Sequence, residues 1–447
     1  MRRSRPSGTP SPPSPDPAGV VPPAATPLDR RQRGAGRLAA ALAAAIGLIA
    51  VLGRSADPAT RPLPPAGAAD GAVSIGAVIA LTGNANLYGQ DQRLGIALAE
   101  RWAAEQARRD PSAAPRPVRL SLEDGASDEQ SAISAFNLML RRGVVALIGP
   151  TLSQQAFAAD PIAQRSGVPV VAPSNTAQGI PQIGHFISRV SAQSSVIAPL
   201  SIEEALHRDP ALSRVAVFYA QDDAYSTAEV AIFQKALAAK GLKPVSVQRT
   251  QLGQSDFQAP ITTVLPQRPE LVVISAQAAD GGNLIRQLRE LGYKGQIVVG
   301  NGLNTPNIYP ICQRWCDGIL IAQAYSPDLD TPINRAFLAL FRRSGASGAP
   351  PQITAQAWTA YQVLFEAIQR LQRRGGLQGV DLGEARRRLM AELLGGRYDT
   401  PLGPIRFTPE GEVIQDRFFV AEVRMGASGR EGRFALVREQ ALEPSAP

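Results

Sequence analysis

From residue 72 onward the chain alternates short β-rich runs with helical patterns, and this alternation limits its possible folds more than any other feature. The β-rich runs, such as "VVALIGP" and "PELVVISA", are almost continuously apolar. Between several of them, apolar residues recur at three- and four-residue spacing, which is typical of amphipathic helices. Apolar strands separated by helices form parallel sheets that are covered on both faces. The runs are too many for one small sheet, so we expect two doubly wound α/β sheets.

The N-terminal part of the chain has a different composition. Residues 1–36 are rich in Pro, Ser and Arg, which predicts a disordered basic leader. Residues 37–54 form an apolar run between Arg37 and Arg54, which is short for a membrane-spanning helix and typical of a signal-peptide core. The basic side precedes the run, so we expect the rest of the chain to be exported to the periplasm. Residues 55–71 are a Pro-rich linker. Cleavage of the segment and its retention as an inner-membrane anchor both remain open.

Charge and motifs exclude several functions. The formal net charge is +8, but nine Arg residues lie before residue 70 and the exported part is nearly neutral, which does not favour nucleic-acid binding. The sequence lacks GxSxG, a P-loop and a GxGxxG that follows a strand. His185 and His207 have no metal-ligand spacing. We therefore expect no enzyme, no cofactor and no metal.

Cys312 and Cys316 are the two cysteines, in "YPICQRWCDG". A C-x3-C pair can be part of a metal site, but no further Cys or nearby His completes four ligands. In an exported protein, a local disulfide is the simpler interpretation, and it is our expectation.

Five segments occur in a characteristic order: "IGAVIALTGNANLYGQDQRLGIALA", "ALIGPTLSQQAFAADPIAQRSGVPVVAPSNTAQGI", "VAVFYAQDDAYSTAEVAIFQKALAAKGLKPV", "DFQAPITTVLPQRPELVVISAQAADGGNLIRQLRELGYKGQIVVGN" and "PLGPIRFTPEGEV". Together they resemble the periplasmic binding proteins of the branched-chain amino acid (Leu/Ile/Val-binding) family, from about Val73 to Val423. The resemblance implies a type I binding-protein fold, in which three crossover strands join two doubly wound lobes that close on a small molecule.

The resemblance also implies ligand-binding residues in the first lobe. Tyr88 lies on the wall against the ligand's side chain. Ser153 offers its hydroxyl to the ligand carboxylate just before a helix, whose free amides favour an anion. Ser174 offers backbone groups, and Thr176 offers its hydroxyl and amide. Ser and Thr are also common helix N-caps, which is the alternative interpretation of these residues.

In the second lobe, the resemblance places Tyr225 over the ligand and Gln277 near it, while Asp280 is expected to cap the following helix. Amino-acid-binding members carry an acidic residue, which pairs with the ligand ammonium, where this chain has Asn301. A buried ammonium without a partner is costly, so such a ligand needs another acid. Asp222, Asp223 and Asp280 are the candidates that the sequence offers.

We therefore expect an exported solute-binding protein that captures an amino acid, or an amide- or carboxylate-like solute, and delivers it to ABC permease subunits. The alternative is a membrane-anchored sensory module of the same fold. The expected boundaries are lobe 1 at 72–192, lobe 2 at 193–322, a lobe 1 return at 323–395, a lobe 2 return with the hinge at 396–425, and a loose C-terminal tail at 426–447.

Overall fold

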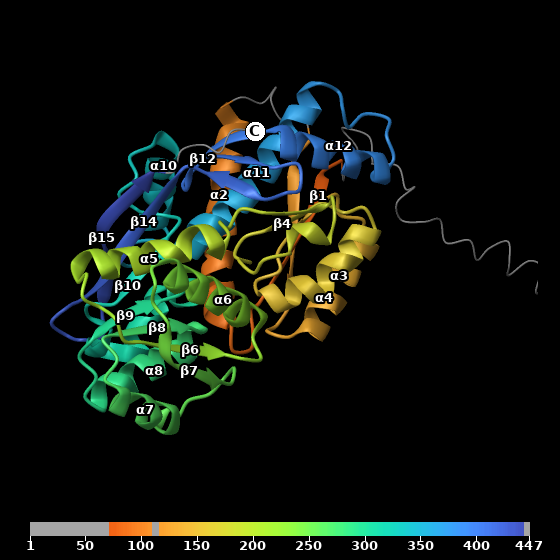
Figure 1. Cartoon of the computed structure of the whole chain (residues 1–447). Helices are drawn as coiled ribbons and strands as arrows, with labels where there is room; N and C mark the ends of the chain where they lie inside the picture. The colour runs from red at the N-terminus through yellow and green to blue at the C-terminus, as the bar shows by residue number, and fades with distance from the viewer. Residues whose placement is uncertain (1–70, 110–115, 442–447) are drawn as a thin grey trace, which may run out of the picture. The chain divides into compact units, whose positions relative to one another are not determined.

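The computed structural model describes residues 71–109 and 116–441. The first lobe of the protein is built on a parallel sheet of five strands in the order β2-β1-β3-β4-β5. The strands are β1 (Val73–Ile79), β2 (Val118–Asp124), β3 (Leu147–Ile148), β4 (Val170–Ala172) and β5 (Ile187–Arg189). The crossover helices are α2 (Asn86–Arg109), α3 (Glu129–Arg142) and α4 (Ser153–Arg165). Figure 1 shows α3 and α4 beside each other, next to this sheet.

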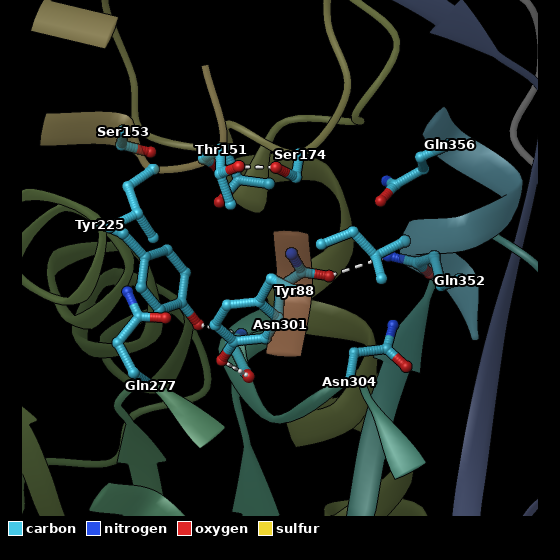
Figure 2. A pocket seen from close by; sticks show the side chains of 14 residues that line it. Tyr88, Thr151, Ser153, Ser174, Tyr225, Gln277, Asn301, Asn304, Gln352 and Gln356 are labelled. Atoms are coloured by element: carbon cyan, nitrogen blue, oxygen red, sulfur yellow. Dashed lines mark hydrogen bonds between the residues drawn. The ribbon is translucent and has the colours of Figure 1, made fainter. Parts of the chain in front are cut away.

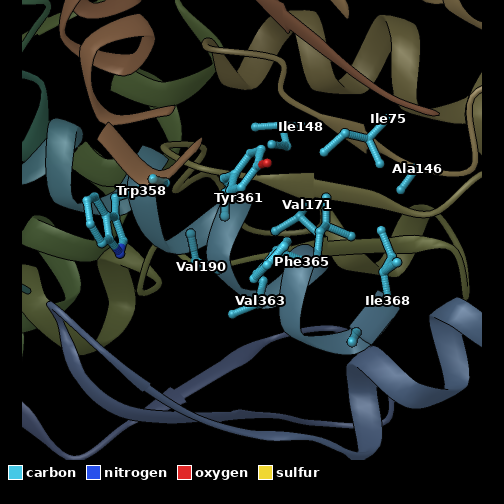
Figure 3. Close-up of a cluster of buried hydrophobic side chains, with 14 of the residues drawn as sticks. Ile75, Ala146, Ile148, Val171, Val190, Trp358, Tyr361, Val363, Phe365 and Ile368 are labelled. Atoms are coloured by element: carbon cyan, nitrogen blue, oxygen red, sulfur yellow. The ribbon is translucent and has the colours of Figure 1, made fainter. Parts of the chain in front are cut away.

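Both faces of the first sheet are covered, as continuously apolar strands require. Strand β1 alternates its contacts: Ile75 packs in a cluster with α2 and α11 (Gln352–Arg373), and Val78 packs in a second cluster with α3 and α4. Trp358 of α11 lies at the centre of the first cluster, with its ring centroid 5.8 Å from that of Trp102. Figure 3 shows Trp358 and Tyr361 of α11 in the cluster that Ile75 and Val171 join. Helix α11 thus closes the core of the first lobe.

The second lobe is built on a sheet of seven strands in the order β15-β14-β10-β9-β8-β6-β7. Five are parallel, and β14 and β15 are antiparallel. The strands are β6 (Val215–Ala220), β7 (Pro244–Thr250), β8 (Leu271–Ser275), β9 (Gln296–Val299), β10 (Leu320–Gln323), β14 (Arg417–Met425) and β15 (Gly432–Ala441). Helices α5 (Ser194–Arg208) and α6 (Ala224–Ala239) pack on one face, and α7 (Gln258–Val264) and α8 (Ala278–Glu290) on the other.

The chain passes between the lobes after β5, after β10 and after β13, which confirms the predicted two-lobe class with three crossovers. After β10 it returns to the first lobe as α10, α11 and α12, followed by a small antiparallel sheet. These elements are α10 (Pro332–Arg343), α12 (Leu382–Gly395), β11 (Arg397–Thr400), β12 (Gly403–Phe407) and β13 (Val413–Gln415).

Two segments differ from the expected boundaries. Residues 397–415 belong with the first lobe, because Tyr398, Leu402 and Ile405 are buried in the cluster around Trp358. Residues 432–441, expected in a loose tail, form β15 along the free edge of β14. The backbone pairing of this strand is reinforced by Phe434, whose ring lies 5.5 Å from that of Tyr309.

Residues 1–70, which carry the predicted leader, apolar segment and most of the linker, lie outside the described residues. Within the described ranges, no helix has both the length and the hydropathy needed to cross a membrane.

Candidate ligand-binding pocket

A pocket lies between the two lobes, at the carboxyl ends of their parallel strands, where open α/β sheets bind ligands (Figure 2). About 490 Å³ of empty space lies within it, part of which is open solvent. Its wall contains all seven residues expected at the ligand. The lining residues are Tyr88, Thr151, Leu152, Ser153, Ser174, Thr176, Tyr225, Gln277, Asn301, Gly302, Asn304, Gln352, Ile353 and Gln356. The structure brings the seven together, and their contact with a ligand stays a prediction.

Ser153 is the first residue of α4, so it places a hydroxyl beside the unpaired amides of a helix start. The N-cap position belongs to Leu152, which has no side-chain hydrogen bond there, and the alternative interpretation of Ser153 as the N-cap is therefore wrong. The Ser153 hydroxyl accepts a 3.3 Å hydrogen bond from the backbone N–H of Ala177, which joins the α4 start to the segment of Thr176. This corner of the pocket is suited to an anion.

A buried network of hydrogen bonds supports this corner of the pocket. The Thr151 hydroxyl donates to Gln92 Oε1 (2.6 Å) and accepts from the N–H of Ala80 (2.9 Å). The Ser174 hydroxyl accepts from Gln92 Nε2 (2.8 Å) and donates to the carbonyl of Thr151 (2.7 Å). The Ser174 hydroxyl is therefore hydrogen-bonded within the protein, so the backbone groups of Ser174 are the ones that remain for a ligand. Gln92, fully buried on α2, orients both side chains and had no signal in the sequence.

Tyr88 of α2 makes hydrogen bonds to the opposite lobe. Its hydroxyl accepts from the backbone N–H of Ala278 (2.7 Å) and donates to the carbonyl of Gly302 (2.5 Å). Burial raises the pKa of this hydroxyl far above its usual range, so it stays protonated and can donate. Tyr88 is thus both a pocket wall and a contact between the lobes.

Tyr225 is fixed by a carboxylate that sequence reasoning missed. Its hydroxyl donates to Glu229 Oε2 (2.5 Å), one turn further along α6, and accepts from the N–H of Gly302 (2.6 Å). Glu229 also accepts from the Ser275 hydroxyl (2.8 Å) and the N–H of Asn301 (3.0 Å). Burial raises the pKa of Glu229, and these donors lower it in turn. Glu229 therefore supports the turn of Asn301 through these hydrogen bonds, but it does not line the pocket itself.

The three acids considered as ammonium partners are engaged elsewhere. Asp222 accepts from the N–H of Leu252 (2.7 Å). Asp223 caps α6 and accepts from Gln277 Nε2 (3.0 Å). Asp280 accepts from the N–H of Gly253 (2.8 Å); Gln277 holds the N-cap position of α8, so the predicted capping role of Asp280 is wrong.

Burial raises the pKa of both Asp223 and Asp280 to about 6. Among the described residues, the pocket wall contains no Asp, Glu, Lys, Arg or His. The wall is therefore polar but uncharged, and its positive potential comes from helix N-termini: that of α4 at Ser153, and those of α6, α8 and α11 at Tyr225, Gln277 and Gln352.

The start of α11 supplies the side of the pocket that the sequence did not predict. Gln352 Oε1 accepts from the N–H of Ala324 (2.7 Å), and its Nε2 donates to Asn301 Oδ1 (3.0 Å). Gln356, one turn later, points its amide into the pocket (Figure 2). These residues lie far from the other lining segments in sequence, and "PPQITAQ" carries no motif that marks a ligand site.

The structure pairs Cys312 with Cys316, whose Cα atoms lie 5.5 Å apart, within the usual range for disulfides. Both side chains are buried beside α8. The disulfide itself stays a prediction.

Two doubly wound lobes with a pocket between their strand ends define the class of two-lobed solute-binding proteins. The model of the family "Periplasmic binding protein" matches residues 72–430, and the chain belongs to this family. The predicted resemblance to its Leu/Ile/Val-binding members is confirmed by the relatives.

The Leu/Ile/Val-binding protein BraC3 of Rhizobium johnstonii is 24% identical over 67% of this chain and 79% of the relative. The leucine-, isoleucine-, valine-, threonine- and alanine-binding protein of Pseudomonas aeruginosa is 24% identical over 78% and 90%. A leucine-binding protein from Thermotoga maritima shares the fold with a TM-score of 0.71 and 23% identity, over 82% of this chain and 98% of that one. A solute-binding protein of an ABC transporter from Rhodopseudomonas palustris, in complex with 3,4-dihydroxybenzoic acid, matches with a TM-score of 0.71 and 19% identity, over 84% and 99%.

Proposed function

We propose that this periplasmic binding protein captures a small carboxylate that lacks a charged amine and delivers it to ABC permease subunits. The observation that carries the ligand class is the uncharged wall: the hydroxyl of Ser153 at the start of α4 and that of Thr176 after β4 suit a carboxylate, and no lining side chain among the described residues can neutralise an ammonium. A neighbour solved with an aromatic acid is compatible with this class, whereas relatives named for amino acids agree with it only in the carboxylate.

Export is the second part of the proposal. It is supported by the Arg-flanked apolar run at residues 37–54, which precedes the whole binding-protein region. We further propose that Cys312 and Cys316 form a disulfide in the oxidising periplasm. The lobes are proposed to move about the crossovers near Ser191, Ala324 and Asp416.

Closure provides the mechanism. The anion corner belongs to the first lobe, whereas Tyr225, Gln277 and Asn301 belong to the second. A ligand that contacts both walls binds the closed conformation better than an open one, and its binding energy shifts the population toward closure. Closed, ligand-bound protein is then the form that a permease can distinguish.

The experiment is a thermal-shift screen of the exported region against monocarboxylates, amides and α-amino acids, followed by small-angle scattering with the best ligand. We expect carboxylates to raise Tm and to make the particle more compact. No stabilisation by monocarboxylates, or no compaction at saturation, contradicts the proposal.

A further inference from the structure

Asn304 is a pocket residue whose side-chain amide nitrogen has no hydrogen-bond acceptor in the described part of the chain. It follows the short turn of Asn301–Leu303 after β9, and its side chain is 5% exposed. Its Nδ2 is buried and, among the described residues, has no hydrogen-bond partner. A buried amide nitrogen in this state is costly unless something in the pocket accepts its hydrogen bond.

The orientation of this amide is fixed from behind. Asn304 Oδ1 accepts a 2.6 Å hydrogen bond from Gln323 Nε2, at the end of β10. Because the oxygen is held by Gln323, the nitrogen is the atom that remains free. Figure 2 shows the Asn304 amide nitrogen directed toward the side of the pocket that Gln352 and Gln356 form.

The side-chain oxygens of Gln352 and Asn301, which line the pocket with Asn304, are already hydrogen-bonded within the protein. Gln352 Oε1 already accepts from the N–H of Ala324, and Asn301 Oδ1 already accepts from Gln352 Nε2. These two hydrogen bonds hold the start of α11 against Ala324 and against the turn of Asn301. The free donor of Asn304 thus faces the space that a ligand would occupy.

We infer that Asn304 Nδ2 donates a hydrogen bond to the ligand, and that the ligand carries a second, uncharged acceptor, a carbonyl or hydroxyl oxygen, at the end remote from its carboxylate. The inference rests on the proposed function, because it takes the carboxylate to lie at Ser153. Ser153 and Asn304 come from different lobes and lie on opposite sides of the pocket in Figure 2. A ligand held at both ends therefore links the lobes, and Asn304 becomes a specificity-determining residue.

The test compares two pairs of probes by calorimetry: pentanoate with 4-oxopentanoate, and benzoate with 4-hydroxybenzoate. In each pair only the second probe has the remote acceptor. For the wild-type protein we expect the second member of at least one pair to bind about five- to tenfold more tightly, which is the contribution of one hydrogen bond. In Asn304→Ala this ratio is expected to fall to about one. The ratio is the readout because a general loss of structure weakens both members alike.

Asn304→Asp provides the second variant, since its carboxylate keeps an acceptor for Gln323 Nε2 but removes the amide donor. At pH 8 we expect it to lose the preference for 4-oxopentanoate, whose ketone oxygen can only accept. Asn283→Ala, on the outer part of α8, is the matched control and is expected to keep the wild-type ratios.

Equal binding within both pairs by the wild-type protein, or an unchanged ratio in both Asn304 variants, overturns the inference while carboxylate binding itself stands. Binding of none of the four probes contradicts the proposed function and the inference together.

Discussion

The hydroxyl of Tyr88, in the first lobe, donates a 2.5 Å hydrogen bond to the carbonyl of Gly302, in the second. The same oxygen accepts from the N–H of Ala278. One phenol thus joins two strand ends of the second lobe to the start of α2, beside the space where the ligand is proposed to bind. Tyr88 therefore both lines the pocket and makes the hydrogen bonds that join the two lobes.

Replacing Tyr88 by phenylalanine tests this coupling. Tyr88→Phe keeps the ring and removes both hydrogen bonds, which together contribute about 1–3 kcal/mol to the closed form. We expect a roughly five- to hundredfold loss of affinity and a more expanded particle by small-angle scattering without ligand. Tyr219→Phe, on β6 and outside the pocket wall, is the control. Unchanged affinity and dimensions in Tyr88→Phe argue against the coupling.

Ser153→Ala tests the anion corner. If the hydroxyl meets a carboxylate, its removal deletes a charge-assisted hydrogen bond of about 1.5–3 kcal/mol, or roughly tenfold or more in affinity. Calorimetry with the best carboxylate measures the change, and Ser134→Ala on the exposed face of α3 is the control. An affinity equal to wild type leaves Ser153 with a structural role only.

The resemblance and the strand ends could predict seven lining residues from both lobes, but not Glu229 behind the pocket or the side that α11 supplies. Ser153 and Thr176 follow consecutive apolar strands, so the sequence places them at one edge of one sheet. Glu229 and Gln352 act through backbone groups of the Asn301 turn and Ala324, which tertiary folding alone brings to them. Strand β15 was missed for a related reason, since its pairing depends on the free edge of β14, which only the folded chain provides.

A half-buried carboxylate between the lobes predicts a pH effect on stability. Asp91 of α2 accepts a 3.1 Å hydrogen bond from Asn307 Nδ2 in the second lobe, and burial raises its pKa to about 6. The unfolded chain loses this proton near pH 4, so the folded state holds more protons between pH 4 and 6. Its contribution to stability therefore falls as the pH rises through that window.

Asp91→Asn removes the free-energy cost of ionising this carboxyl group in the folded state. It keeps a side-chain oxygen that can accept the hydrogen bond from Asn307. We expect it to be more stable than wild type above pH 7 by about 2 kcal/mol and similar to wild type at pH 4. Denaturant unfolding at both pH values measures the difference, with the exposed Glu129→Gln as control. A difference that does not change with pH excludes this role for Asp91.

The cysteine pair predicts the redox state of the exported protein. Both side chains are buried, so thiol labelling has to be done after unfolding in denaturant without reductant. We expect no reactive thiol before reduction and two afterwards. Two reactive thiols in the unreduced exported protein contradict the disulfide.

The central claim, that the pocket takes a carboxylate without a charged amine, is tested most directly by calorimetry with leucine and 4-methylpentanoate, which differ only by the ammonium. The wild-type protein is predicted to bind 4-methylpentanoate at least as tightly as leucine, because no lining acid pairs with the ammonium. Asn301→Asp places a carboxylate on the wall and is predicted to raise the affinity for leucine relative to 4-methylpentanoate by about tenfold or more. Clear preference of the wild-type protein for leucine, with no gain in Asn301→Asp, contradicts the account.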